Sequence, residues 1–124
     1  MNKKILIIED ETGLQTSLIA SLKGLGLEPF SAFNGEDGLK ALQNDPSFGL
    51  VVLDLILPRK HGIEVLEEMR KNPKTKDIPV AILTNIEDAK MIQRAFELGV
   101  AAYLVKVNYD AKDIAERLLK VLSA

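Results

Sequence analysis

The sequence of 124 residues contains no cysteine and no long apolar segment. Without cysteine the chain has no disulfide bond, no thiolate nucleophile and no cysteine-based zinc site, and redox chemistry would need a cofactor. A membrane-spanning helix needs roughly 20 apolar residues, and no run in this sequence approaches that length. The residues before Asp10 are too few for the charged and apolar regions of a signal peptide. We therefore expect a cytoplasmic protein without a membrane segment.

Lysine and arginine form no dense cluster beyond the pair Lys3 and Lys4, and the formal net charge is -2. Surfaces that bind nucleic acid usually carry a basic patch, so direct binding of nucleic acid is not expected. The hydrophobic share of 47% and the charged share of 27% are typical of a soluble globular protein. At this length we expect a single domain spanning residues 1–124, which folds without disulfide or metal cross-links.

Histidine is scarce, and His61 is the one example. It lies in the polar stretch 58–62, where we predict an exposed loop residue rather than a general base. The GxxxxGK[ST] pattern of phosphate-binding loops is missing as well. Gly24 and Gly26 do not replace it, because they follow a predicted helix instead of a strand. Histidine-based hydrolysis and phosphate-loop nucleotide chemistry are therefore disfavoured.

Short apolar segments alternate with longer segments in which apolar residues recur every three or four positions. The short segments predict strands at residues 4–8, 28–33, 50–53, 79–83 and 102–105. The longer segments predict helices at about residues 12–25, 35–44, 62–71, 87–98 and 110–122. This alternation, which no linker or repeat interrupts, is typical of repeated βα units.

The predicted first, third and fourth strands are continuous apolar runs, as expected of strands buried on both faces of a parallel sheet. Pro29 in the second strand fits an edge position, where a missing N–H donor costs least. Asp110 is a suitable cap for the amino end of the last helix. With right-handed crossovers, the pattern predicts an α/β doubly wound (βα)5 flavodoxin-like fold. Its five-stranded parallel sheet would have the order 2-1-3-4-5, with helices on both faces.

Acidic residues follow two predicted strands at the edge where such sheets bind ligands, outside the carboxyl ends of the strands. Glu9, Asp10 and Glu11 follow the first strand, and Asp54 follows the third. Crowded carboxylates repel one another unless a cation lies between them. Because hard divalent ions prefer oxygen ligands, an all-oxygen set of this kind suits Mg²⁺.

Thr84 and Lys106 stand at the ends of the predicted fourth and fifth strands, facing the same cleft. A metal ion, a hydroxyl and an ammonium can neutralise the oxygens of a transferring phosphoryl group, while a carboxylate can accept it as an acyl phosphate. Each residue alone has an ordinary interpretation as loop, cap or surface, and Glu11 with Thr12 is best explained as a helix start. Their combination around one cleft favours phosphoryl transfer.

The chain resembles a response-regulator receiver domain of two-component signalling systems over nearly its whole length. The motifs that carry the resemblance are Ile7-Ile8-Glu9-Asp10-Glu11, Val52-Leu53-Asp54-Leu55-Ile56-Leu57-Pro58 with Gly62, Leu83-Thr84, Tyr103-Leu104-Val105-Lys106, and Gly99 before Ala101-Ala102-Tyr103. The combination is specific, although no single motif is. The resemblance implies a bacterial-type regulatory domain of a phosphorelay. Such a domain is not an enzyme and catalyses only its own phosphorylation and dephosphorylation.

The resemblance also implies a role for each candidate site residue. Asp54 would be the phosphoacceptor. Asp10 and Asp54 would bind Mg²⁺ directly, together with the backbone carbonyl of Ile56. Glu9 would act on the metal through a water molecule.

A switch and a set of partners are implied in the same way. Thr84 and Lys106 would hold the phosphoryl oxygens, and movement of the Thr84 hydroxyl would accompany rotation of the Tyr103 ring, for which plain packing is the alternative. The phosphoryl donor would be a histidine kinase or phosphotransfer protein. A second copy in a homodimer, or an effector, would bind the output face of the fourth helix, fifth strand and fifth helix. That face includes Met91, Phe96, Tyr103 and Arg117.

Three positions depart from the family pattern. Val107 replaces the proline that usually follows the lysine, and a cis peptide bond before a residue other than proline costs roughly 3–4 kcal/mol. We therefore predict a trans bond with a rearranged loop through Asn108. Asn85 replaces a small residue after Thr84 and is expected to narrow access to the phosphoryl group. Ile56 places an apolar side chain beside the site, where it can affect the position of an attacking water.

Proteins of other classes remain as alternatives. A flavodoxin-like electron carrier would share the fold, but Glu9 to Glu11 would repel a flavin phosphate. A phosphatase of the haloacid dehalogenase type would have a second Asp where this chain has Ile56. The nearest rival is a degenerate receiver that binds partners without phosphorylation, although the acceptor and the metal ligands are all present here. The sequence leaves open the cognate kinase, the oligomeric state, and whether the chain is a stand-alone protein or an excised module.

Overall fold

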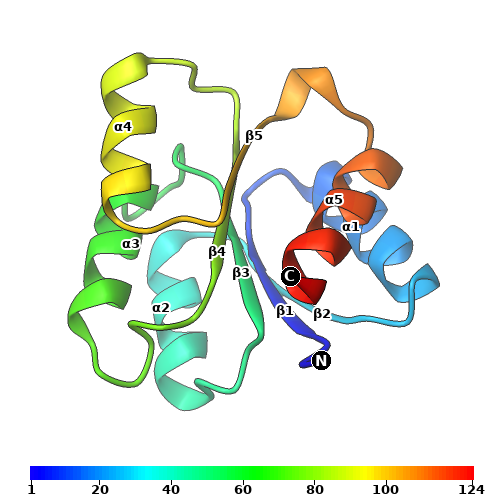
Figure 1. Ribbon diagram of the computed structural model, residues 1–124, viewed down its shortest axis with the longest axis horizontal. Coiled ribbons are helices and arrows are strands. Elements are labelled where there is room, and N and C mark those ends of the chain that lie inside the picture. Colours follow the sequence, from blue (N-terminus) through cyan, green and yellow to red (C-terminus); the bar gives the residue numbers. More distant parts are fainter.

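The structure, a computed structural model, describes residues 1–124, and a five-stranded parallel sheet forms its centre (Figure 1). The strands are β1 (Lys4–Ile8), β2 (Glu28–Ala32), β3 (Leu50–Leu53), β4 (Val80–Thr84) and β5 (Ala102–Val105). Their order is β2-β1-β3-β4-β5, which confirms the predicted topology. Since the order reverses between β1 and β3, the carboxyl ends of these two strands form the switch point of the sheet.

Helices cover both faces of the sheet (Figure 1). They are α1 (Thr12–Gly24), α2 (Gly35–Asn44), α3 (Gly62–Lys71), α4 (Ala89–Glu97) and α5 (Ala111–Ser123). α1 and α5 lie together on one face, and α2, α3 and α4 lie on the other. The doubly wound α/β fold class is therefore confirmed.

Side chains of each central strand alternate between the two faces. In β1, Ile5 and Ile7 pack with the face that α1 and α5 cover, while Leu6 and Ile8 pack with the opposite face. Both faces are buried, so the strand needs apolar residues at every position, as the continuous runs predicted. β2 is an edge strand, and Pro29 is accommodated there as expected.

The ends of several elements differ from the prediction by one or two residues. β2 ends at Ala32, and β4 begins one residue later and extends to Thr84. α4 begins at Ala89 because the Asp88 side chain accepts the N–H of Lys90 and so caps the helix. Asp110 caps α5 as predicted, by accepting the N–H of Asp113.

Of two connecting segments with specific predictions, one agrees with its prediction and one does not. The chain after β5 forms a single 3-10 turn, η1 (Lys106–Asn108), and every peptide bond is trans, which confirms the predicted isomer before Val107. His61 is not an exposed loop residue, because it is half-buried and its Nδ1 accepts the N–H of Ile63 to cap α3. No helix is both long and apolar enough to cross a bilayer.

Candidate functional site

Three carboxylates meet at the switch point of the sheet. Glu9 directly follows β1 and Asp54 directly follows β3, and the last residues of these strands, Ile8 and Leu53, are paired in register. Oxygens of Glu9, Asp10 and Asp54 all lie within 4.8 Å of one another. Glu9 and Asp54 are only 2% and 4% exposed, whereas Asp10 is exposed. We call these three residues the acidic cluster.

The Lys106 ammonium lies against two members of the acidic cluster. It donates a hydrogen bond of 2.7 Å to Asp54 Oδ2 and forms an ion pair with Glu9 Oε1. Burial lowers the pKa of Lys106, but the hydrogen bonds with Asp54 and Glu9 outweigh burial, so the pKa lies above its ordinary value. One lysine cation therefore pairs with two of the three carboxylates, and negative charge remains in excess at this edge of the sheet.

Burial raises the pKa of the Glu9 carboxyl to about 7. The nearby charge of Asp54 adds to this effect, while Lys106 and the backbone N–H of Glu11 oppose it. That N–H donates to Glu9 Oε2 at 3.1 Å, whereas the buried Oε1 pairs with the Lys106 ammonium. An anionic oxygen in such surroundings is stabilised by additional positive charge.

Asp54 is held by the loop that follows it. Asp54 Oδ1 accepts a hydrogen bond of 3.2 Å from the backbone N–H of Ile56, while Oδ2 accepts from Lys106. The Ile56 side chain is 59% exposed beside this carboxylate. Both oxygens of Asp54 thus have a fixed donor, which orients the carboxylate.

Thr84 and Tyr103 are connected through the loop between β4 and α4. Thr84 is fully buried, and its hydroxyl oxygen lies 3.5 Å from the backbone nitrogen of Ile86. The Tyr103 hydroxyl donates a hydrogen bond of 2.7 Å to the carbonyl oxygen of Ile86. Burial raises the pKa of Tyr103, and its ring lies 6.5 Å from the ring of Phe96 on α4. Ile86 therefore contacts both residues of the predicted switch.

Gln15 supports the site and was not identified from the sequence. This buried side chain on α1 donates to the carbonyl oxygens of Ile7, Glu9 and Ala32, at 2.8, 3.1 and 3.1 Å. It fixes the carboxyl end of β1, from which Glu9 projects. Its signal in the sequence is a polar residue three positions before Leu18 on the apolar side of an amphipathic helix.

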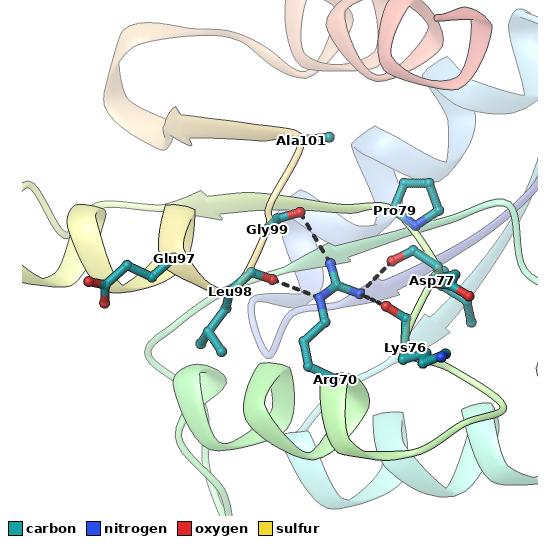
Figure 2. Close-up of a pocket in the computed structure, with 9 residues that line it drawn as sticks. Arg70, Lys76, Asp77, Pro79, Glu97, Leu98, Gly99 and Ala101 are labelled. Atoms are coloured by element: carbon teal, nitrogen blue, oxygen red, sulfur yellow. Dashed lines mark hydrogen bonds between the residues drawn. The ribbon is translucent and has the colours of Figure 1, made fainter.

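The largest cavity lies elsewhere, at the amino ends of β4 and β5 (Figure 2). This open groove of about 570 Å³ contains Arg70, whose guanidinium donates to the carbonyl oxygens of Lys76, Ile78, Leu98 and Gly99. Figure 2 shows the guanidinium surrounded by these carbonyl groups. Because four of its five N–H donors are already used, Arg70 acts as a structural link between two loops.

Comparison with known proteins identifies the family. A model of the response regulator receiver domain matches residues 5–119, so the chain belongs to this family, whose members serve as regulatory domains in two-component systems. The transcriptional regulatory protein CiaR of Streptococcus pneumoniae is 38% identical over 106 residues, which are 86% of this chain and 46% of CiaR. CrdR of Helicobacter pylori is 33% identical over 95% of this chain and 54% of its own length. The chain spans about half the length of the curated relatives it matches.

Solved structures show the same fold. The Mn²⁺-bound form of response regulator Rcp1 is 32% identical, with a TM-score of 0.83 and coverage of 98% of this chain and 92% of Rcp1. A CheY-like receiver domain protein from Methanospirillum hungatei is 26% identical, with a TM-score of 0.88 and coverage of 99% and 95%.

Proposed function

We propose that this chain is a phosphoacceptor receiver domain that takes a phosphoryl group onto Asp54 from a phosphohistidine of a histidine kinase or phosphotransfer protein. The observation that carries this proposal is the meeting of the buried Asp54 carboxylate with Glu9, Asp10 and the Lys106 ammonium at the switch point of the sheet. The chain's membership of the receiver-domain family, whose members are regulatory domains, supports the proposal.

The residues of the acidic cluster fit a magnesium ion. Three carboxylates meet beside a single ammonium, which pairs with two of them, so the donor set favours a further cation of the kind that prefers oxygen ligands. Asp10 and Asp54 would hold it together with the backbone carbonyl of Ile56, and Glu9 would act through water. Bound there, Mg²⁺ would offset negative charge on the carboxylates and on the phosphoryl oxygens.

The transfer itself needs one nucleophile and neighbouring donors. An oxygen of Asp54 forms a bond to phosphorus as the bond from phosphorus to the histidine nitrogen breaks, and the electron pair of that bond stays on the imidazole. The Lys106 ammonium, already 2.7 Å from Asp54 Oδ2, is placed to neutralise the phosphoryl oxygens. The Thr84 hydroxyl would donate a further hydrogen bond. The product is an acyl phosphate on the protein.

The output of this switch would be read on the surface of α4, β5 and α5. The half-buried Met91 packs against the core, and the half-buried Tyr103 lies beside Phe96, whose side chain is 51% exposed. Arg117 on α5 lies over the ring of Tyr109, with its guanidinium carbon 4.4 Å from the ring centroid. Movement of Thr84 toward a phosphoryl group would reach Tyr103 through Ile86. A second copy of this chain or an effector would then bind this surface.

Intact-mass spectrometry after treatment with acetyl phosphate tests the proposal. Wild type is expected to gain one phosphoryl group in the presence of MgCl₂ and none after chelation. Asp54→Asn is expected to gain none, whereas the matched control Asp77→Asn, an exposed position at the opposite edge of the sheet, should behave as wild type. An adduct that persists in Asp54→Asn would assign a different acceptor. Absence of any adduct on wild type would favour the alternative, a degenerate receiver that binds partners without phosphorylation.

A further inference from the structure

Asn85 and Val107 connect the two loops that border the acidic cluster. Asn85 follows β4, and Val107 lies in the turn η1 directly after Lys106. The backbone N–H of Val107 donates a hydrogen bond of 3.1 Å to Asn85 Oδ1. This bond joins the chain that leaves β4 to the chain that leaves β5.

The hydrogen bond depends on the residue types at both positions. A proline at position 107 would have no N–H to donate, and an alanine at position 85 would have no side-chain acceptor. The Val107 side chain is 75% exposed, so its own packing contributes little to its position. The pairing of β5 with β4 ends at Thr84 and Val105, and the bond to Asn85 adds a restraint on residue 107 beyond that point.

The turn matters because it carries Lys106. A lysine ammonium sits at the end of a flexible four-carbon stem, so a defined position requires a fixed backbone and fixed partners. Its partners here are Glu9 and Asp54. A bound cation would compete with the ammonium for these carboxylates, and a phosphoryl group on Asp54 would offer the ammonium new oxygens. The bond between Asn85 and Val107 involves no formal charge, so it does not depend directly on the charges around Lys106.

We infer that Asn85 is a positioning residue: through the N–H of Val107 it holds the turn that carries Lys106, and so keeps the ammonium beside the phosphoryl group on Asp54. This inference rests on the proposed function, because it describes how the same site keeps its lysine in place during transfer. Asn85 acts through the backbone and needs no contact with the phosphoryl group. One hydrogen bond thereby gives a shared role to positions 85 and 107.

Three variants separate this role from others. Asn85→Ala removes the acceptor, Val107→Pro removes the donor, and the matched control Val107→Ala removes side-chain atoms but keeps the N–H. The rate of adduct formation on Asp54 is measured against acetyl phosphate concentration at saturating MgCl₂. Loss of one hydrogen bond is expected to lower the maximal rate about two- to tenfold in Asn85→Ala and in Val107→Pro. The double variant should be no slower than either single variant, and Val107→Ala should match wild type.

A second readout follows the hydrogen bond directly. Amide hydrogen exchange at residue 107, followed by NMR, should be faster in Asn85→Ala than in wild type, while the midpoint of thermal unfolding stays the same. Asn85→Ala with a wild-type rate of phosphorylation would overturn the positioning role alone. An equal loss of rate from Asn85→Ala in the wild-type and Val107→Pro backgrounds would also overturn it, since Asn85 would then act by another route.

The experiment also separates failure of the inference from failure of the proposed function. If wild type takes no phosphoryl group, the proposed function fails and the positioning role fails with it. If wild type is phosphorylated on Asp54 and Asn85→Ala is indistinguishable from it, only the positioning role fails. Should Val107→Pro not fold, the comparison of Asn85→Ala with Val107→Ala decides by rate and by exchange.

Discussion

Gly62 lies so close to Asp54 that a β-carbon at position 62 would be 2.3 Å from the Asp54 carbonyl oxygen. The Gly62 N–H donates to the carbonyl of Leu55, which brings the first turn of α3 against the chain that leaves β3. The atoms that such a β-carbon would meet belong to the backbone of residues 54 and 55, which cannot move aside as a flexible side chain can. Glycine at this position therefore allows α3 to pack against the loop that follows Asp54.

Substitution Gly62→Ala is expected to destabilise the protein by about 1–3 kcal/mol, because the added methyl group must displace the backbone of residues 54 and 55. Urea denaturation measures the free energy of unfolding. The matched control is Gly13→Ala on α1, where a β-carbon meets nothing within 4 Å, and a gain of up to about 1 kcal/mol is expected there. Equal stability of Gly62→Ala and wild type would contradict the proposed role of the close approach.

Magnesium is expected to raise the midpoint of thermal unfolding, because a cation that binds the acidic cluster binds the folded chain and not the unfolded one. At a free concentration ten times the Kd, the gain is about 1.4 kcal/mol. Asp10→Asn should remove most of this gain, whereas the exposed Glu116→Gln on α5 should keep it. Differential scanning fluorimetry with and without MgCl₂ makes the comparison, and a full magnesium response in Asp10→Asn would argue against a metal at the cluster.

Arg70 is expected to stabilise the fold without affecting phosphorylation. Arg70→Ala would leave four carbonyl oxygens without this donor and should cost about 1–3 kcal/mol. Arg70→Lys should recover little of the lost stability, since one ammonium cannot reproduce the planar guanidinium that donates to two loops. The exposed neighbour Lys71→Ala should change stability by less than about 0.5 kcal/mol. Urea denaturation, together with an unchanged rate of phosphorylation in all three variants, checks this assignment.

Asp45 is expected to make stability depend on pH in the acid range. A hydrogen bond from Lys4, with further hydrogen bonds from Ser47, lowers the pKa of the Asp45 carboxyl from 3.8 to about 2. Because the pKa is lower in the folded state, this stabilisation is present above pH 3.8 and is lost as the pH falls toward 2. The difference in unfolding free energy between wild type and Asp45→Asn should therefore shrink over that range. A difference in unfolding free energy that stays constant between pH 5 and pH 2 would contradict the stabilising role of the Asp45 carboxylate.

The acidic cluster could be predicted from the sequence because it follows from strand order and strand ends. Glu9 and Asp54 each come directly after a buried strand, and parallel strands that are neighbours end at the same edge of the sheet. The predicted bounds of β1, β3 and β5 match the structure, because their apolar runs stop where polar residues begin. The roles of these residues in phosphoryl transfer stay predictions until the adduct is measured.

Details of the loops could not be predicted in the same way. His61 caps α3 instead of lying exposed, and residues 106–108 form a 3-10 turn. Neither Gln15 nor the link made by Arg70 was identified from the sequence. In each case the decisive partner is a backbone group, and backbone groups are the same for every residue type, so the sequence pattern carries little information about them.

By itself, the sequence determined the alternation of strands and helices, the burial of the sheet on both faces and the set of acidic, hydroxyl and ammonium groups at the strand ends. These features depend on residue type and local spacing. The tertiary structure decided which groups meet: the Lys106 ammonium with Glu9 and Asp54, and the N–H of Val107 with Asn85. The physical reason is that hydrogen bonds and ion pairs act over a few ångströms, and partners far apart in the chain come that close only when the packed sheet and helices place them there.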